Sequence, residues 1–250
     1  MYSDVQVTLR NGETRDLVQK AYPISNFIAA GFAGSVRIGF MLLESLSYML
    51  QIPPDAPANV AWDPLWVSVN WPQVARQVFE REPAAEQALG SHILMIGAPP
   101  TETAGLGAKI FITRFVAPEF HPGIMSRTIK ICSIGSGAGI AEYKHSIKPL
   151  FRLTSGILRG EIMRSGGWGE ALGTAISHTL NDEPRRGISR HIHMILVHRG
   201  EIRVGQNDEN IYPPNDAARI EIRMPNVATS YSQFLRLVQS SGHDGACAVC

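Results

Sequence analysis

Three strand-like runs follow one another in the middle of the chain: SHILMIGAPP (91–100), AKIFITRFVAP (108–118) and RTIKICSIG (127–135). Glycine and proline turns separate the runs, which is typical of an antiparallel sheet. Two helical stretches follow at about 140–152 and 168–179, and then a hairpin whose turn lies near Arg199 and Gly200. The order of strands and helices predicts sheets packed against helices.

Both ends of the chain add elements to this pattern. A strand over 4–10 reaches a turn at Asn11 and Gly12, and another strand in 17–34 ends in glycines. Apolar residues from Ser35 to Leu50 recur at helical spacing, so this range is predicted as a helix. A final strand (217–225) and a last helix (230–241) close the chain. We see no clean boundary and predict a single domain over residues 1–250.

Residues 51–72 are rich in proline and tryptophan and are interpreted as a connection or insertion. A short helix is predicted from Pro72 to Arg81, with the proline at its start. The tryptophans Trp62, Trp66 and Trp71 could line a pocket or a partner surface. Packing of the insertion onto the body is the simpler interpretation.

Charge and cysteine content indicate which partners and which cellular compartment to expect. The chain has 23 basic and 22 acidic side chains, so neither a nucleic-acid partner nor a polybasic membrane anchor is expected. The longest apolar stretch is interrupted by Arg37 and Glu44, which favours an amphipathic helix over a membrane span. Three cysteines without a disulfide framework, and a polar N-terminus without a signal-peptide pattern, favour the cytoplasm.

The last ten residues, 241–250, are predicted as a flexible tail. They include Cys247 and Cys250, a C-x-x-C pair that could bind metal or cycle between redox states. No second pair accompanies it. His191 and His193 alternate on one strand and could also chelate a metal, but two ligands are too few. Histidines on a polar strand face are the simpler interpretation, and no metal is expected.

The glycine-rich run KICSIGSGAGIAEY (130–143) raises the possibility of dinucleotide binding. Its glycines Gly135, Gly137 and Gly139 are wrongly spaced, because Ile140 stands where the third glycine of G-x-G-x-x-G is required. No strand ending in an acidic residue follows at the right distance. No cofactor is therefore expected. Neither a G-x-S-x-G elbow nor a P-loop is present.

Four segments point to one family. The first segment, residues 3–24, carries Asp4 in SDVQVTL and, sixteen positions later, Lys20 in VQKAYPI, and the second, AAGFAG (29–34), leads into the predicted first long helix. The turn IGSG contains Ser136, and NDEPRRG (181–187) contains Asp182. Together these segments resemble the β-type subunits of proteasomes, especially the bacterial proteasome-like peptidase that works with an unfolding ATPase. The resemblance covers about residues 3–205.

One of the four segments departs from the family's pattern. In NDEPRRG, Asp182 and Gly187 stand at suitable positions for the family's aspartate and second glycine. Arg185 and Arg186 occupy the positions of the family's serine and first glycine. This departure puts an intact catalytic support shell in doubt.

The resemblance implies a fold and an activity. The fold would be an α+β, four-layer αββα sandwich with two antiparallel sheets between helices. The activity would be peptide hydrolysis by an N-terminal threonine in a homo-oligomeric ring, with a possible ATP-dependent unfoldase as partner. Lys20 and Asp4 would lower the pKa of the attacking hydroxyl, Ser136 and Asp182 would support the site, and glycine-turn N–H groups would hold the oxyanion.

The nucleophile of such an enzyme would lie about sixteen residues before Asp4, by the resemblance, whereas the printed sequence begins at Met1. Two hypotheses follow: the true start lies upstream and carries a threonine, or the chain is a non-catalytic subunit built on the same fold. In either case the first strand is missing here, and a sheet edge would be open to a neighbour. Whether the protein is an enzyme stays open.

Overall fold

The computed structural model describes most of the first half of the chain and parts of the second. The described residues are 1–57, 60–98, 110–126, 132–136, 138, 141, 145, 176, 179–180, 188–198, 201–206, 210–211, 220–221, 224–240 and 248–249. Within them the protein is a mixed α/β structure, and all pairs of named strands are antiparallel. This much of the predicted fold class is confirmed.

The largest sheet has five strands in the order β4-β5-β6-β7-β8. Its strands are β4 (Ala21–Ser25), β5 (Ile28–Gly34), β6 (Ser91–Gly97), β7 (Phe111–Val116) and β8 (Gly123–Ser126).

The predicted meander is confirmed for β6 and β7; most of its predicted third strand, at 127–131, lies outside the described residues, and β8 pairs with β7 ahead of it. Gly123 pairs with Arg114 directly after the turn, so β8 starts earlier than RTIKICSIG. The described part of that run, Cys132–Ile134, is not strand. The single strand predicted before the glycines is instead the hairpin β4-β5, because the chain reverses at Asn26 and Phe27.

Helix α1 (Val36–Met49) follows β5 and confirms the predicted helix. Ser35 caps its N-terminus, since the Ser35 hydroxyl oxygen accepts a hydrogen bond from the Ile38 N–H at 3.1 Å. Leu50 forms the C-terminal cap, and its N–H donates to the Leu46 carbonyl at 3.1 Å. Local capping and apolar spacing together account for both ends of this helix.

Helix α2 (Pro64–Glu80) starts eight residues before the predicted start at Pro72. The Asp63 carboxylate accepts from the Leu65 N–H at 2.9 Å, and Pro64 occupies the first turn, so Asp63-Pro64 is the true start signal. The proposed insertion is therefore helical from Pro64 onward. Trp71 lies in this helix and is fully buried, with its ring edge-on to Phe115 at 4.9 Å.

The remaining elements lie in three smaller sheets and two helices. One sheet has the order β1-β9-β10 and contains the predicted hairpin, whose turn lies between His198 and Glu201. The other two have the orders β13-β2-β3 and β11-β12. Their bounds are β1 (Tyr2–Asp4), β2 (Gln6–Leu9), β3 (Thr14–Asp16), β9 (Ile192–His198), β10 (Glu201–Gln206), β11 (Asn210–Ile211), β12 (Ile220–Glu221), β13 (Ala248–Val249), α3 (Ala84–Gln87) and α7 (Tyr231–Ser240).

Two of these elements bear on the predictions for the end of the chain. Helix α7 confirms the predicted last helix. Strand β13 holds the two described residues of the predicted flexible tail, because Ala248 pairs with Leu9 and Val249 with Thr8, and the rest of 241–250 lies outside the described residues. The free backbone edge of β2 gives this short apolar segment its hydrogen-bonding partner.

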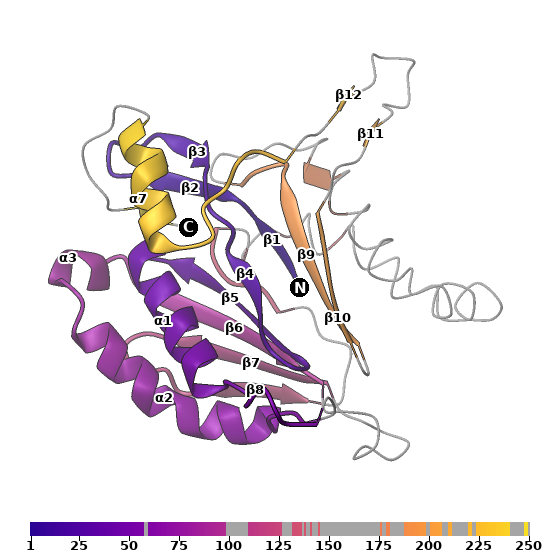
Figure 1. Cartoon of the computed structure of the whole chain (residues 1–250). Coiled ribbons are helices and arrows are strands. Elements are labelled where there is room, and N and C mark those ends of the chain that lie inside the picture. Colours follow the sequence, from indigo (N-terminus) through magenta and orange to yellow (C-terminus); the bar gives the residue numbers. More distant parts are fainter. Residues whose placement is uncertain are drawn as a thin grey trace.

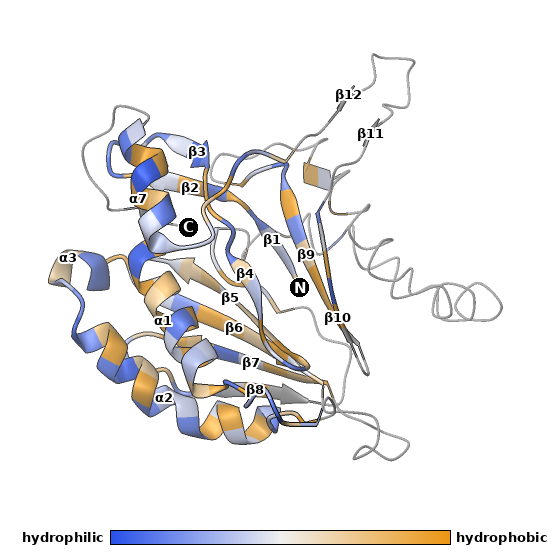
Figure 2. Cartoon of the chain, in the orientation of Figure 1, coloured by the Kyte–Doolittle hydropathy of each residue, from blue (hydrophilic) through white to orange (hydrophobic). Residues whose placement is uncertain are grey.

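The described elements form layers (Figure 1): α1 and α2 cover one face of the five-stranded sheet, and the β1-β9-β10 sheet lies on its other side. Hydrophobic residues recur along α1, α2 and the strands between the layers (Figure 2). On β5, Ile28, Ala30 and Phe32 belong to the large helix-side core, whereas Ala29 packs with Ile195 of β9. Small residues on alternate β5 positions thus let the two sheets approach.

The second helical layer of the predicted sandwich falls almost wholly outside the described residues. Of the ranges 140–152 and 168–179, the structure describes only single helical positions, at 141, 145, 176 and 179. The four-layer arrangement therefore stays a prediction, as does the single domain.

Candidate functional site

Lys20 and Asp4, which the sequence paired by their spacing, are in direct contact. Lys20 Nζ lies 2.8 Å from Asp4 Oδ1. The lysine is 5% exposed, and about a quarter of the Asp4 side chain is exposed. A buried ammonium group is stable only when a counter-charge or acceptors compensate its lost hydration. The aspartate supplies that compensation.

The ion pair joins two sheets. Asp4 is the last residue of β1, and Lys20 directly precedes β4 of the five-stranded sheet. The Asp4 carboxylate also accepts from the Gln6 N–H at 2.8 Å, which fixes its orientation. The Lys20 carbonyl accepts from the Phe32 N–H at 3.0 Å, so the lysine backbone is held against β5. Strands that are far apart in the chain thus set the position of the positive charge.

At Gly31 and Gly34 of AAGFAG, neighbouring atoms lie so close to the backbone that they leave little room for a side chain. A Cβ at Gly31 would lie 3.1 Å from both the Lys20 carbonyl oxygen and Met1 Sδ. Gly34 has a φ of +99°, and a Cβ there would lie 2.4 Å from the Gly90 carbonyl oxygen. The segment therefore brings bare backbone next to Lys20 and then turns into α1.

Met1 packs beside Gly31. Its amino group donates to the Ile195 carbonyl at 2.7 Å, and its carbonyl accepts from the Ile195 N–H at 2.8 Å. Burial lowers the pKa of the Met1 amino group to about 6, because the charged form loses its hydration. The Met1 side chain packs in the cluster formed by Ala21, Ala29 and Ile195.

The other predicted site residues are not joined to Lys20 by any contact among the described residues. Ser136 is exposed, in a turn where the Ala138 N–H donates to the Gly135 carbonyl at 3.0 Å. Gly135 has a φ of +77°, which accounts for a glycine at that point. Asp182 and Gly187 lie outside the described residues, so their role stays a prediction.

A second polar cluster was missed by the sequence reasoning. Asp16 Oδ2 accepts from the Ser189 hydroxyl at 2.6 Å and lies 2.6 Å from His191 Nδ1. Gln6 Nε2 donates to the other carboxylate oxygen at 3.3 Å. Ser189 is 2% exposed, and its proton is directed to the aspartate. The Ser189 hydroxyl also lies 3.2 Å from His191 Nδ1, and the cluster ties β3 to the entry of β9.

His191 and His193 lie in different surroundings. His191 engages Asp16 before β9 begins, whereas His193 lies within β9, opposite Ser3, and is 7% exposed. The expectation of two histidines on a polar strand face was wrong, because this part of β9 is covered by neighbouring structure. Among the described residues, no three His, Cys, Asp or Glu side chains gather as metal ligands would.

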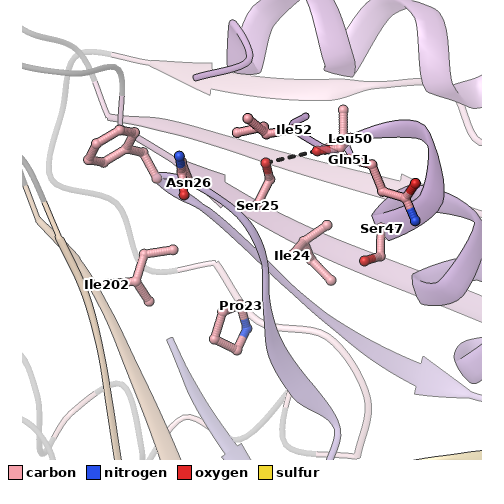
Figure 3. Close-up of a pocket in the computed structure, with 10 residues that line it drawn as sticks. Pro23, Ile24, Ser25, Asn26, Ser47, Leu50, Gln51, Ile52 and Ile202 are labelled. Carbon is pink, nitrogen blue, oxygen red and sulfur yellow. Dashed lines mark hydrogen bonds between the residues drawn. The ribbon is translucent and has the colours of Figure 1, made fainter. Parts of the chain in front are cut away.

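A pocket of about 540 Å³ lies at the far end of the β4-β5 hairpin, and neither Lys20 nor Asp4 lines it. In its wall the Ser25 hydroxyl donates to the Leu50 carbonyl at 3.0 Å (Figure 3). The lining combines apolar side chains with uncharged polar ones and contains no charged group. Its residues are Pro23, Ile24, Ser25, Asn26, Phe27, Ser47, Leu50, Gln51, Ile52 and Ile202.

Comparison with known proteins found similarity among solved structures. No family model and no curated protein matches the sequence. Among solved structures, the chain is similar to Anbu (ancestral beta-subunit) from Yersinia bercovieri, with 11% identity and a TM-score of 0.49. The similarity covers 96% of this chain and 87% of that chain. Such a similarity establishes no shared activity.

Among the helices of the described ranges, none combines the length and apolar character that crossing a membrane requires.

Proposed function

We propose that this chain is a peptide-hydrolase subunit of the proteasome-like type and that Lys20 and Asp4 belong to its active site. The observation that carries the proposal is the buried Lys20 ammonium, held 2.8 Å from Asp4 where two sheets meet. A fixed positive charge in a poorly hydrated place stabilises the alkoxide of a nearby hydroxyl. Bare β5 backbone at Gly31 lies beside it.

The chemistry would be acyl transfer. A threonine hydroxyl from a segment preceding Met1 would add to the peptide carbonyl, and its proton would pass to the departing amine. Water would then hydrolyse the resulting ester and restore the hydroxyl. Lys20 would stay protonated throughout and act through its charge, with Asp4 holding it in place. Ser136 and Asp182 would support the site, within a homo-oligomeric ring that an ATP-dependent unfoldase could feed.

A non-catalytic subunit on the same fold is the second candidate, and Met1 favours it. In a chain that begins at Met1, the amino group donates to the Ile195 carbonyl and the side chain packs beside Gly31. The Met1 side chain therefore occupies space beside Gly31, close to the Lys20 backbone carbonyl. The Lys20–Asp4 pair would then serve only to join the two sheets.

The deciding experiment starts with the intact mass and N-terminal sequence of the protein from its native source. The protein is then treated with a peptide epoxyketone, which reacts with an N-terminal threonine. A start at an upstream threonine with stoichiometric labelling, lost in Lys20→Met, would support the peptidase. A start at Met1 without labelling would overturn it and leave the structural subunit. Circular dichroism of Lys20→Met controls for unfolding.

A further inference from the structure

Large apolar side chains are exposed together where α1 ends and α2 begins. We define the aromatic surface as Tyr48, Trp62, Trp66 and Val69. Tyr48 is 77% exposed, Val69 61% and Trp66 43%. Single exposed apolar residues are ordinary, but neighbouring ones that include tryptophan and tyrosine mark interaction surfaces.

Two contacts place Trp62 and Trp66 next to each other at the end of α1, two residues after Tyr48. The Trp62 indole N–H donates to the Leu50 carbonyl at the end of α1, at 3.1 Å. Trp62 and Trp66 stack with 5.2 Å between ring centroids. Val69 follows Trp66 by three positions and so shares its helix face. Hydrophobic residues are visible over this part of α2 in Figure 2.

The charged residues of this region are all acidic. The stretch from Ile38 to Ala75 contains no lysine, arginine or histidine, although the whole chain has 23 basic and 22 acidic side chains. Its charged residues are Glu44, Asp55 and Asp63, and all three are exposed. Glu44 precedes Tyr48 by one helical turn, and Asp63 lies next to Trp62. The charged residues nearest in sequence to Tyr48 and Trp62 are therefore acidic.

Two hydrogen bonds connect the pocket drawn in Figure 3 with the segment that leads into α2. Leu50, whose carbonyl accepts from Trp62, lines the pocket. Asn26 also lines it and donates to the Val60 carbonyl at 3.0 Å. The pocket has the size of ordinary ligand sites, and its uncharged wall combines apolar and polar side chains, so it suits an uncharged side chain.

We propose that the aromatic surface and this pocket bind a partner protein through a segment in which apolar side chains are flanked by lysine or arginine. The apolar residue would enter the pocket or pack on Trp66, and the basic residues would face Glu44, Asp55 and Asp63. A second copy meeting this surface face to face would set three acidic groups against three, which is unfavourable. The proposal does not depend on a catalytic nucleophile.

The test uses a synthetic peptide with Leu and Phe at helical spacing and Lys on either side, and a matched peptide with Glu in place of Lys. Binding is measured by calorimetry and by tryptophan fluorescence at low and high salt. The Lys peptide should bind, more weakly as salt rises, and the Glu peptide should not. Equal binding of the two peptides, or binding of neither, would overturn the proposal.

Matched variants locate the site. The triple variant E44Q, D55N and D63N removes the charges while keeping the side-chain sizes, and Asn at position 63 still caps α2. It should weaken the Lys peptide by about tenfold or more and abolish the salt effect. Trp66→Ala should also weaken it, whereas Glu80→Gln, at the other end of α2, should not. Self-association that Trp66→Ala abolishes, without peptide binding, would assign the surface to a second copy and overturn the proposal.

Discussion

His191 Nδ1 lies 2.6 Å from Asp16 Oδ2, although 175 positions separate the two residues in the chain. The same carboxylate oxygen accepts from the Ser189 hydroxyl, and Ser189 also accepts from the His191 N–H at 2.9 Å. One side chain from the end of β3 therefore organises the segment that enters β9. Because β9 pairs with β1, the arrangement supports the sheet that carries Asp4.

Asp16→Asn tests the strength of this arrangement. The amide keeps the size of the carboxylate but loses the charge-assisted hydrogen bonds, and it leaves the buried Ser189 hydroxyl poorly matched. We expect the free energy of unfolding to fall by about 1–3 kcal/mol, measured by urea denaturation. Asp55→Asn, at an exposed position, should change it little. Equal stability of the two variants would contradict the structural role assigned to Asp16.

The Lys20–Asp4 pair can be measured by a double-mutant cycle with Lys20→Met, Asp4→Asn and the double variant. Asp4→Asn leaves a buried ammonium group without its counter-charge, so we expect a loss of about 1–3 kcal/mol. The double variant should lose less than the two single losses added together, because methionine replaces the charge. Denaturation of all four proteins gives the coupling energy. Strict additivity would mean that the two groups do not interact in solution.

The two polar clusters differ in how far sequence could predict them. Lys20 and Asp4 were paired by a short spacing within a recognisable pattern, and their contact is present. The Asp16 cluster joins residues from opposite ends of the chain, and neither end carries a pattern that names the other. Long-range polar contacts depend on how sheets pack, which single-sequence periodicity does not encode.

Helix boundaries show the same division between local and distant causes. The limits of α1 follow from local signals, with Ser35 as cap and apolar residues at helical spacing. The start of α2 carried an equally local signal in Asp63-Pro64, but the second proline, Pro72, was taken as the start instead. A proline inside a helix is normally costly. Here the burial of Trp71 beside it contributes packing that sequence alone does not reveal.

Replacing Gly39 in α1 by alanine should lower the stability of the protein, although helix propensity alone would raise it. Glycine to alanine inside a helix usually stabilises by about 0.5–1 kcal/mol. At Gly39 a Cβ would lie 2.1 Å from Cδ2 of the buried Phe32 ring, so the ring or the helix must shift. We expect Gly39→Ala to destabilise by about 1–3 kcal/mol. Thermal or urea unfolding measures this, with Ser47→Ala on the exposed face of α1 as the propensity control. A stabilised Gly39→Ala would show that α1 does not pack this closely on β5.

For protein chains that begin at Met1, stability should depend on pH through the buried amino group. Its pKa is lowered from 8.0 to about 6 by burial. Between those values the unfolded chain binds a proton that the folded chain does not. The contribution of this group to the free energy of unfolding is therefore greatest above about pH 8. It falls by about 2–3 kcal/mol in all as the pH falls toward 6.

The matched control is the same chain with an acetylated Met1, which has no titrating amine. Urea denaturation of both proteins from pH 5 to 9 is the measurement, and the difference between their stabilities isolates the amino group from the histidines. We expect that difference to change across pH 6–8 and to level off on either side. Parallel curves would mean that the Met1 amine is hydrated in solution.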